Sequence, residues 1–171
     1  MKATAILLVA LSLLAVTSTA LAGAPRGSRA NPYPVGTKVR LPGGTPWKLR
    51  VNKSIPNATR LVLNWNRYNP PPERGHQFFI VTVTLEYFGK GWGYPFAPTR
   101  FSAVGRANIA YSLDGDSCGS IPRQLNFGKR VASGGSLTGN LCFSVWKSDV
   151  GSLLLAYGTS PYSAKAFFRV R

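Results

Sequence analysis

Hydrophobic and polar residues alternate along most of this chain, with the period of two that is typical of β-strands buried on one face. The clearest example runs from Gln77 to Phe88. One face of this segment is apolar and comprises Phe79, Val81, Val83, Leu85 and Tyr87, while the other comprises Thr82, Thr84 and Glu86. Phe78 and Ile80 make its beginning apolar on both faces, as expected of a central strand.

The same alternation predicts several further strands, with apolar side chains inward and basic or amide side chains outward. They are expected at residues 47–51, 60–66, 101–104, 107–113, 137–146, 152–157 and 164–170. After residue 22, no segment keeps the apolar spacing of a helix over three turns without a glycine or a proline. The sequence therefore predicts an all-β protein.

Turn-forming residues separate these segments. They occur at Pro42-Gly43-Gly44, Pro70-Pro71-Pro72, Asp114-Gly115 and Gly134-Gly135, in a chain with 18 glycines and 13 prolines. About eight short strands with such spacing favour an antiparallel β-sandwich over a barrel. The barrel stays open as the alternative at this point.

The first 22 residues have the organisation of a secretory signal peptide. Lys2 supplies a positive charge, Ile6 to Val16 is almost purely apolar, and Ala20-Leu21-Ala22 places small residues where signal peptidase recognises them. Polar residues interrupt the apolar run, which is therefore too short to span a bilayer. We therefore expect residues 1–22 to be removed on export. The rest of the sequence has no second long apolar stretch, so no transmembrane segment is predicted there.

The rest of the chain divides into a short lead-in and one domain. Residues 23–36 contain Gly, Pro, Ser, Arg and Asn with almost no aliphatic side chains, so we expect a flexible segment with little to bury. Residues 37–171 then form a single domain, which is long enough for a substantial core.

Cys118 and Cys142 are the two cysteines of the chain. In an exported protein, a single pair of cysteines predicts one disulfide. Closing a loop of about 25 residues stabilises a fold by roughly 3–4 kcal/mol in the chain-entropy argument. A metal site is the rival interpretation, but the chain has one histidine and no CxxC motif, so too few ligands are available.

The charge is strongly unbalanced, with 21 Lys and Arg against 5 Asp and Glu and a net charge of +16. Such a field attracts polyanions without specifying a fold. Compatible partners are an anionic cell-wall polymer, an acidic lipid surface, an acidic protein and nucleic acid, although no RNP-like motif supports the last. The simpler interpretation is a solvated cationic surface without a ligand.

Two segments resemble a known family. Residues 74–85, RGHQFFIVTVTL, resemble the G-x-x-F-x-x-V-x-V-T strand of secreted bacterial immunoglobulin-like domains of unknown function, which are related to the mycobacterial immunoprotective extracellular antigen. Residues 134–145, GGSLTGNLCFSV, resemble the turn and the G-x-x-x-F-x-V strand of these domains, and residues 152–157 match their final apolar stretch. The resemblance covers roughly residues 35–171. It implies a two-sheet immunoglobulin-like sandwich, export and no established activity, and it defines no functional residues to transfer.

Residues 89–96, GKGWGYPF, form the most suggestive surface feature. Glycine and proline predict a turn, which crowds Trp92, Tyr94 and Phe96 where the backbone is least able to bury all three rings. Exposed rings beside Lys90 are suited to stacking on sugars or bases or to anchoring a protein partner. The other interpretation is that the rings fold back and cap the open end of the sandwich.

The loop at residues 67–74 adds a second aromatic and basic element. Its candidate ligand-binding residues are Arg67, Tyr68 and Arg74, which join Lys90, Trp92, Tyr94 and Phe96 as the binding residues that the sequence predicts.

Candidates for catalysis and metal binding are few. The single histidine, His76, has Glu73 nearby in sequence, but the chain has no G-x-S-x-G motif and its carboxylates are scattered. Asp114-Gly115-Asp116-Ser117 resembles a calcium loop only superficially and is better explained as a turn that leads into the disulfide. We therefore expect no metal, no cofactor and no enzymatic activity.

The sequence as a whole predicts an exported, immunoglobulin-like antiparallel β-sandwich, and it does not determine the oligomeric state. Its expected role is non-catalytic binding or adhesion toward anionic envelope or extracellular polymers. The alternatives are a structural or antigenic protein without a dedicated ligand, a secreted hydrolase that uses His76, and an extracellular nucleic-acid binder.

Overall fold

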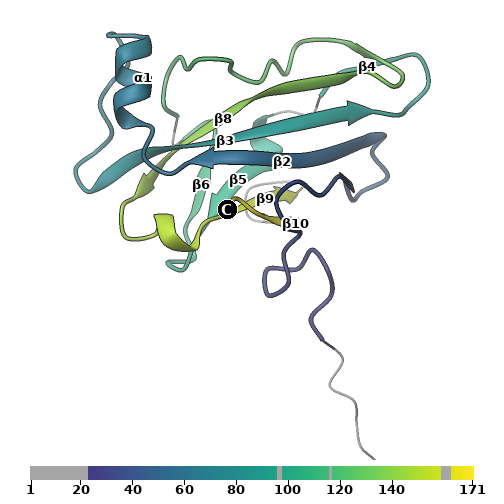
Figure 1. Ribbon diagram of the computed structural model, residues 1–171, viewed down its shortest axis with the longest axis horizontal. Helices are drawn as coiled ribbons and strands as arrows, with labels where there is room; N and C mark the ends of the chain where they lie inside the picture. Colours follow the sequence, from purple (N-terminus) through teal and green to yellow (C-terminus); the bar gives the residue numbers. More distant parts are fainter. Residues whose placement is uncertain (1–22, 96–97, 116, 159–162) are drawn as a thin grey trace, which may run out of the picture.

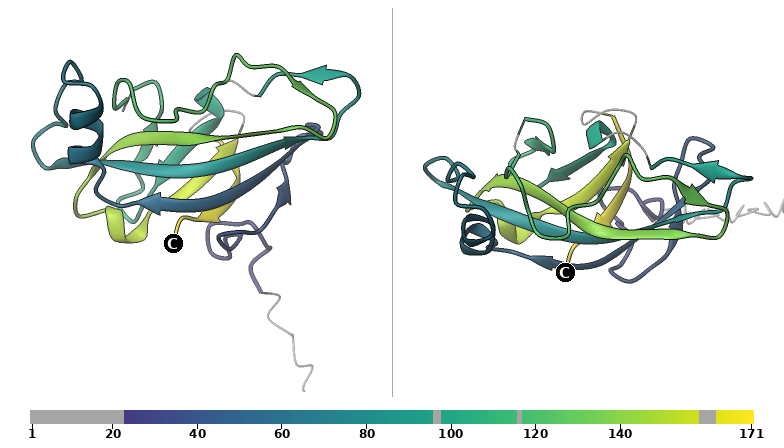
Figure 2. Two further views of the ribbon diagram at one scale, coloured as in Figure 1. Left: turned by 45° about the horizontal axis from the view of Figure 1, so that its top comes forward. Right: turned by 90° about the horizontal axis from the view of Figure 1, so that it is seen from above.

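The computed structural model of this protein describes residues 23–95, 98–115, 117–158 and 163–171. The predicted signal peptide, residues 1–22, lies outside the described residues, and so do Phe96 and Asp116. Two antiparallel β-sheets pack against each other as layers (Figures 1 and 2), so the predicted sandwich is confirmed. No helix in the described ranges is both long enough and apolar enough to cross a membrane.

Each of the two sheets has four strands. The first has the order β1-β2-β3-β8 and comprises β1 (Val39–Arg40), β2 (Trp47–Ile55), β3 (His76–Tyr87) and β8 (Ser136–Trp146). The second has the order β10-β9-β5-β6 and comprises β10 (Ala164–Arg169), β9 (Leu154–Gly158), β5 (Phe101–Val104) and β6 (Ala110–Ser112).

Short elements complete the fold. A small ribbon pairs β4 (Trp92–Gly93) with β7 (Val131–Ala132), near the end of β3 and β8 that lies far from α1 (Thr59–Trp65) (Figure 1). Two 3-10 turns, η1 (Pro98–Arg100) and η2 (Val150–Ser152), precede β5 and β9.

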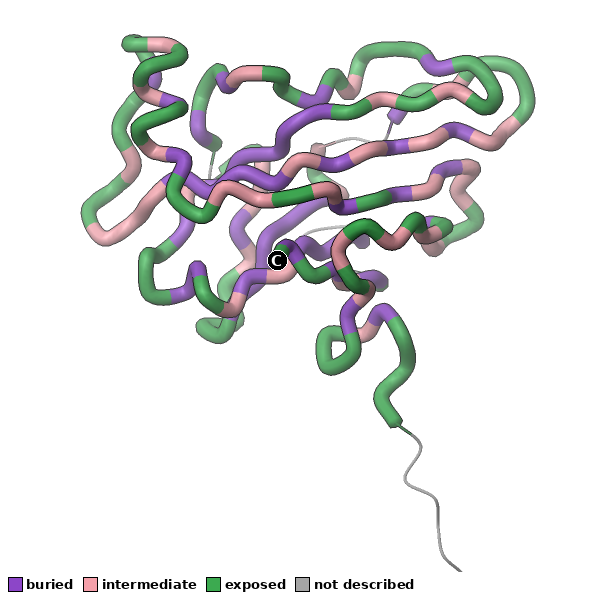
Figure 3. Tube along the Cα trace, in the orientation of Figure 1, coloured by how far each residue is buried: buried purple, intermediate pink, exposed green. Residues whose placement is uncertain are grey.

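An inner core fills the space between the sheets. The predicted apolar face of β3 belongs to it, and Phe79, Val83 and Leu85 are completely buried there. Phe101 from β5 and Phe168 from β10 face them from the second sheet. Burial of this face across the whole length of β3 confirms the alternation that the sequence shows (Figure 3).

A second apolar cluster lies on the outer face of the first sheet. We call it the outer cluster; it comprises Ala58, Val62, Phe78, Ile80, Cys118, Ile121 and Cys142. Because Phe78 and Ile80 are buried in it, the first half of β3 is covered on both faces, as predicted for a central strand. The cover consists of α1 and the segment that follows Cys118.

The sequence predicts a strand at residues 60–66, and this prediction is wrong. Thr59–Trp65 forms the helix α1, which buries Val62 in the outer cluster and leaves Leu61 and Trp65 exposed. A helix of seven residues has too few turns for its period to stand out against an accidental alternation. Such a short helix is stabilised by tertiary burial rather than by its own hydrogen bonds.

The prediction of a strand at residues 107–113 is too long. β6 covers only Ala110–Ser112, because Asn108 has a left-handed backbone with φ of 60°. The N–H of Ala107 is instead held by Oδ1 of Asp149 at 3.1 Å. A side-chain acceptor has therefore replaced a strand partner at this position.

The lead-in packs against the domain more than its polarity suggests. The N–H of Tyr33 donates to the carbonyl of Phe167, and the N–H of Arg169 donates to the carbonyl of Tyr33, at 2.9 and 2.8 Å. The ring of Tyr33 also lies 5.3 Å from that of Phe168. These contacts provide hydrogen-bond partners for backbone groups at the outer edge of β10. The segment at residues 23–36 therefore packs on the domain and buries part of its own surface there.

Cys118 and Cys142 form the predicted disulfide, with their Cα atoms 5.9 Å apart. The segment after Cys118 then crosses β8 closely at Gly139, where a Cβ atom would lie 2.5 Å from the Cα of Leu125. The N–H of Leu125 donates to the carbonyl of Asn140 at 3.0 Å. The segment thus covers part of the open edge of β8, which would otherwise be free to pair with other strands.

Replacing both Cys118 and Cys142 with alanine should lower the free energy of unfolding by roughly 3–4 kcal/mol, because the unfolded chain regains the freedom of the closed loop. Urea unfolding measures this loss, and the wild type under reducing conditions should show a similar one. A loss below about 1 kcal/mol would contradict the role given to the cross-link.

Gly139→Ala should destabilise the protein by about 1–3 kcal/mol, because its Cβ meets backbone atoms that cannot rotate away. Gly151→Ala is the matched control, since a Cβ there meets nothing within 4 Å. The control should stay within about 0.5 kcal/mol of the wild type in the same urea titration. Equal stability of the two variants would show that residues 122–125 are not held tightly against β8.

Candidate functional site

An exposed aromatic and basic surface lies at the β4–β7 ribbon. Trp92 and Tyr94 are 63 % and 58 % exposed. Trp92 pairs with Ala132 of β7, and this pairing brings Arg130, the residue just before β7, to the Trp92 ring. The guanidinium carbon of Arg130 lies 5.3 Å from the centroid of that ring. In the sequence, the exposed Lys90 lies two residues before Trp92, and the exposed Lys129 directly precedes Arg130. We call this surface the distal tip; it comprises Lys90, Trp92, Tyr94, Lys129 and Arg130.

The glycines of the turn explain why these rings point outward. Gly89 and Gly93 both lie against the ring of Tyr87, and a Cβ atom at either position would approach that ring to about 2.5 Å or less. The hydroxyl of Tyr87 donates to the carbonyl of Lys90 at 2.9 Å and fixes the turn. Because Tyr87 already fills the space under the turn, Trp92 has no room to fold inward.

The structure does not support the interpretation in which these rings cap the sandwich, as far as it describes them. Trp92 and Tyr94 are exposed, and Phe96 lies outside the described residues. An exposed tryptophan with an arginine over its face is a ready surface for stacking, because both groups are flat and only weakly hydrated.

The second predicted element lies elsewhere. Tyr68 is 77 % exposed, and Arg67 donates to its hydroxyl at 2.9 Å. Arg74 is also exposed, just before β3 begins. β3 has 12 residues and at about 3.3 Å per residue separates this loop from the distal tip by roughly 35–40 Å. The predicted binding residues therefore divide into two separate surfaces at opposite ends of β3.

His76 is held by packing rather than by a catalytic network. Its ring lies 4.2 Å from that of Trp146, and its Nδ1 atom is buried without a hydrogen-bond partner. Oε2 of Glu73 is 3.9 Å from Nδ1, which is too far for a hydrogen bond. Within the described ranges, no serine hydroxyl is hydrogen-bonded to Nδ1 of His76. The hydrolase alternative thus has only the Glu73 contact in its favour.

The carboxylates near the sheets are already engaged within the fold. Glu86 forms ion pairs with Lys38 and, at 3.1 Å, with Lys48. The hydrogen bond from Lys38, followed by that from Lys48, lowers the pKa of the Glu86 carboxyl. Asp149 is buried and accepts hydrogen bonds from three groups: the N–H of Ala107 and the hydroxyls of Tyr111 and Ser152. In the part of the chain that the structure describes, no carboxylate forms an ion pair with a cation of the distal tip.

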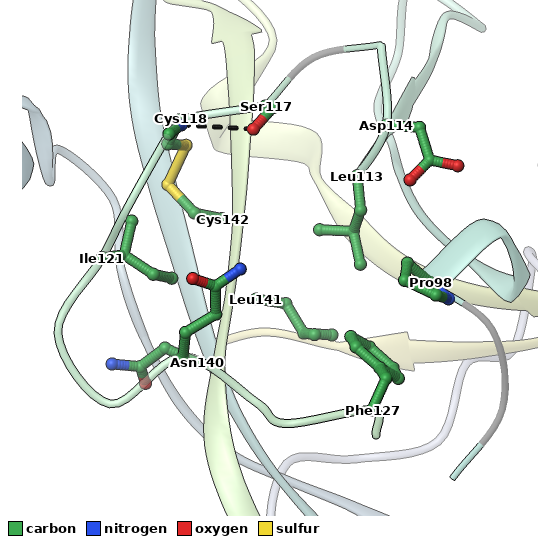
Figure 4. Close-up of a pocket in the computed structure, with 12 residues that line it drawn as sticks. Pro98, Leu113, Asp114, Ser117, Cys118, Ile121, Phe127, Asn140, Leu141 and Cys142 are labelled. Atoms are coloured by element: carbon green, nitrogen blue, oxygen red, sulfur yellow. Dashed lines mark hydrogen bonds between the residues drawn. A yellow bond between two sulfur atoms is a disulfide. The ribbon is translucent and has the colours of Figure 1, made fainter. Parts of the chain in front are cut away.

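A small pocket of about 140 Å³ lies beside the disulfide (Figure 4). Its apolar walls include Leu113, Ile121, Phe127 and Leu141, and Asp114 and Ser117 add polar groups. This volume suits a small molecule rather than a polymer segment. Asp114 belongs to the candidate calcium sequence, and its partner Asp116 lies outside the described residues. The residues that the structure describes contain no group of three or more His, Cys, Asp or Glu side chains that could hold a metal ion.

Two cations of the distal tip were not predicted from the sequence. Lys129 and Arg130 lie far along the chain from Trp92, and the pairing of β4 with β7 brings Arg130 to the Trp92 ring. The sole local signal is the pair of adjacent basic residues just before the short strand. Nothing in that pair indicates which aromatic residue it will meet.

A solved structure of low sequence identity shares this architecture. The secreted protein MPT63 from Mycobacterium tuberculosis matches with a TM-score of 0.52 and 18 % identity, over 81 % of this chain and 95 % of that chain. The fold is an immunoglobulin-like β-sandwich. This finding confirms the fold that the resemblance in the sequence implied, and at this identity the similarity concerns the fold alone.

Two further structures match with lower TM-scores. The yjhA protein from Bacillus subtilis has a TM-score of 0.44 and 17 % identity, over 73 % of this chain and 79 % of that chain. A conserved hypothetical protein from Bacillus anthracis has a TM-score of 0.45 and 14 % identity, over 80 % of this chain and 95 % of that chain. No protein-family profile and no curated protein sequence matches this chain.

Glu86→Gln should reduce the loss of stability in acid. The pKa of Glu86 is lowered by folding, so its contribution is complete above the unfolded value of about 4.3 and disappears as the pH falls through the folded pKa. We expect the free energy of unfolding to fall more between pH 7 and pH 3 in the wild type than in the variant. Urea unfolding at both pH values measures this difference.

Glu73→Gln is the control for this measurement, because the Glu73 side chain is 87 % exposed and, within the described residues, no lysine or arginine forms an ion pair with it. It should keep a pH dependence close to that of the wild type. The same pH dependence in Glu86→Gln and the wild type would show that the two lysines do not stabilise the Glu86 carboxylate.

Proposed function

We propose that this protein is an exported, non-catalytic binding module that contacts an anionic extracellular or envelope polymer through the distal tip. The observation that carries the proposal is the exposed Trp92 ring with the Arg130 guanidinium beside it, and the exposed Lys90 and Lys129 lie close to these two residues in the sequence. A polymer that presents both flat sugar faces and negative charges matches this combination.

The chemistry of the distal tip supports a carbohydrate polyanion over other polyanions. An indole face packs on the apolar face of a sugar ring, and the neighbouring cations attract acidic groups on the same chain. The absence of carboxylate ion pairs at the tip, within the described residues, keeps its positive potential available to a ligand. A surface of this kind gives modest affinity at one contact, and a repeating polymer multiplies the contacts.

Export is the second part of the proposal. It is supported by the signal-like residues 1–22, by the disulfide between Cys118 and Cys142, and by fold similarity to a protein described as secreted. A basic module outside the cell would meet anionic polymers of the envelope before most other partners.

The test is binding to polygalacturonate, a soluble acidic polysaccharide, at about 20 mM salt. The variant Lys90→Gln/Lys129→Gln/Arg130→Gln should bind roughly tenfold more weakly than the wild type, because three exposed cations each contribute a fraction of the attraction. The matched control Arg106→Gln/Lys147→Gln/Lys165→Gln removes the same charge from exposed positions elsewhere and should lose less than about threefold. Fluorescence anisotropy of the labelled polymer measures all three affinities.

A further variant separates stacking from charge. Trp92→Ala should weaken binding to polygalacturonate but leave binding to polyglutamate, which has charge without sugar rings, close to that of the wild type. Equal losses in the two triple variants, or no polysaccharide binding at low salt, would overturn the proposal. Preference for single-stranded DNA over the polysaccharide would assign the distal tip to nucleic acid instead.

A further inference from the structure

A groove of about 230 Å³ lies on the outer face of the first sheet, beside α1. Its apolar wall comes from Ile55, Leu61 and Pro122, and its polar floor comes from Thr82 and Thr138. Lys53 on β2 and Arg123 on the crossing segment also line it, and both are exposed. The groove is remote from the distal tip, because Lys53 pairs with Thr82 near the middle of β3.

Arg123 adopts an unfavourable backbone conformation at this groove. Its φ angle is 51°, in the left-handed backbone region that residues other than glycine, asparagine and aspartate rarely adopt. The surrounding hydrogen bonds impose this conformation: the N–H of Asn140 donates to the carbonyl of Arg123, and the side-chain amide of Asn140 donates to the carbonyl of Pro122, both at 2.8 Å. These hydrogen bonds hold the backbone of Arg123 beside the groove.

The polar floor of the groove is largely satisfied within the protein. The hydroxyl of Thr82 donates to Oδ1 of Asn140 at 2.7 Å, and the hydroxyls of Thr84 and Thr138 are 2.8 Å apart. A ligand would therefore gain little from hydrogen bonds to the floor. What the groove offers is an apolar wall with Leu61, which is 42 % exposed, together with the two cationic side chains.

We propose that this groove binds a small anionic amphiphile, a molecule with one carboxylate or phosphate head and an alkyl body. The cations Lys53 and Arg123 match the head, and the wall formed by Ile55, Leu61 and Pro122 matches the alkyl body. The groove of about 230 Å³ is open to solvent, so its occupant is a small molecule rather than a folded partner. In the described part of the chain, no carboxylate lines the groove to oppose an anion.

Decanoate, kept below the concentration at which it aggregates, is the probe. Titration into the isotope-labelled wild-type protein should shift the amide signals of Lys53, Thr82 and Thr138 in a saturable way. Two matched molecules test the chemistry: decyltrimethylammonium keeps the chain and reverses the charge, and butyrate keeps the head and shortens the chain. Both should cause much smaller shifts at these amides.

Two variants test the residues. Lys53→Gln and Arg123→Gly should each weaken decanoate binding by roughly fivefold, because each removes one cation from the groove. Arg123→Gly is the sharper one, since glycine adopts a φ of 51° without strain and the variant should unfold at a temperature no lower than the wild type. Arg60→Gln removes an exposed cation on α1 that does not line the groove, and it should bind decanoate as the wild type does.

Several outcomes would overturn this inference. Equal binding of decanoate and decyltrimethylammonium would show that charge plays no part, and unchanged affinity in both groove variants would place the site elsewhere. Binding to phosphatidylglycerol vesicles without any saturable effect of monomeric decanoate would assign the surface to a membrane instead of a small molecule. These outcomes are independent of polysaccharide binding at the distal tip, which uses other residues.

Discussion

Burial of β3 on both faces is the constraint on which the rest of this structure depends. Along one face, Phe79 and its neighbours require the second sheet, and that requirement produces the sandwich. Along the other, Phe78 and Ile80 require separate cover, which two layers of sheet cannot provide. Helix α1 and the segment after Cys118 supply that cover, and the disulfide fixes the segment to β8 directly beside the residues it protects.

The second half of β3 has a polar outer face, and the contrast explains where binding chemistry is available. Thr84 and Glu86 need no cover, so this part of the sheet stays open and its side chains pair with one another and with lysines. The apolar cover on the first half ends abruptly at Leu61 and Pro122, and the groove lies at this boundary. At the far end, the ring of Tyr87 fills the space beneath a glycine-rich turn, so Trp92 is displaced into solvent. Both proposed sites thus follow from how the two halves of β3 are covered.

The fold determines where the excess positive charge is available on the surface. Lys38 and Lys48 share the single negative charge of Glu86, and Asp149 accepts hydrogen bonds that hold the loop before β6. Many of the other described cations are exposed, and a few of them lie beside exposed apolar groups. A net charge of +16 alone describes attraction to any polyanion, whereas cations placed next to an indole ring or an alkyl-sized groove select among anions by shape.

The sequence by itself determined the elements whose pattern is local and long. The alternation at residues 77–88 is strong enough to identify the central strand and its two buried faces, and two cysteines in a chain with a signal-like start predict the disulfide. The tertiary structure decided what depends on distant partners. Residues 59–65 form a helix that buries Val62 against β3, and Arg130 reaches Trp92 because β7 pairs with β4. Short segments carry too little periodicity to determine their own conformation, so the surfaces they meet decide it.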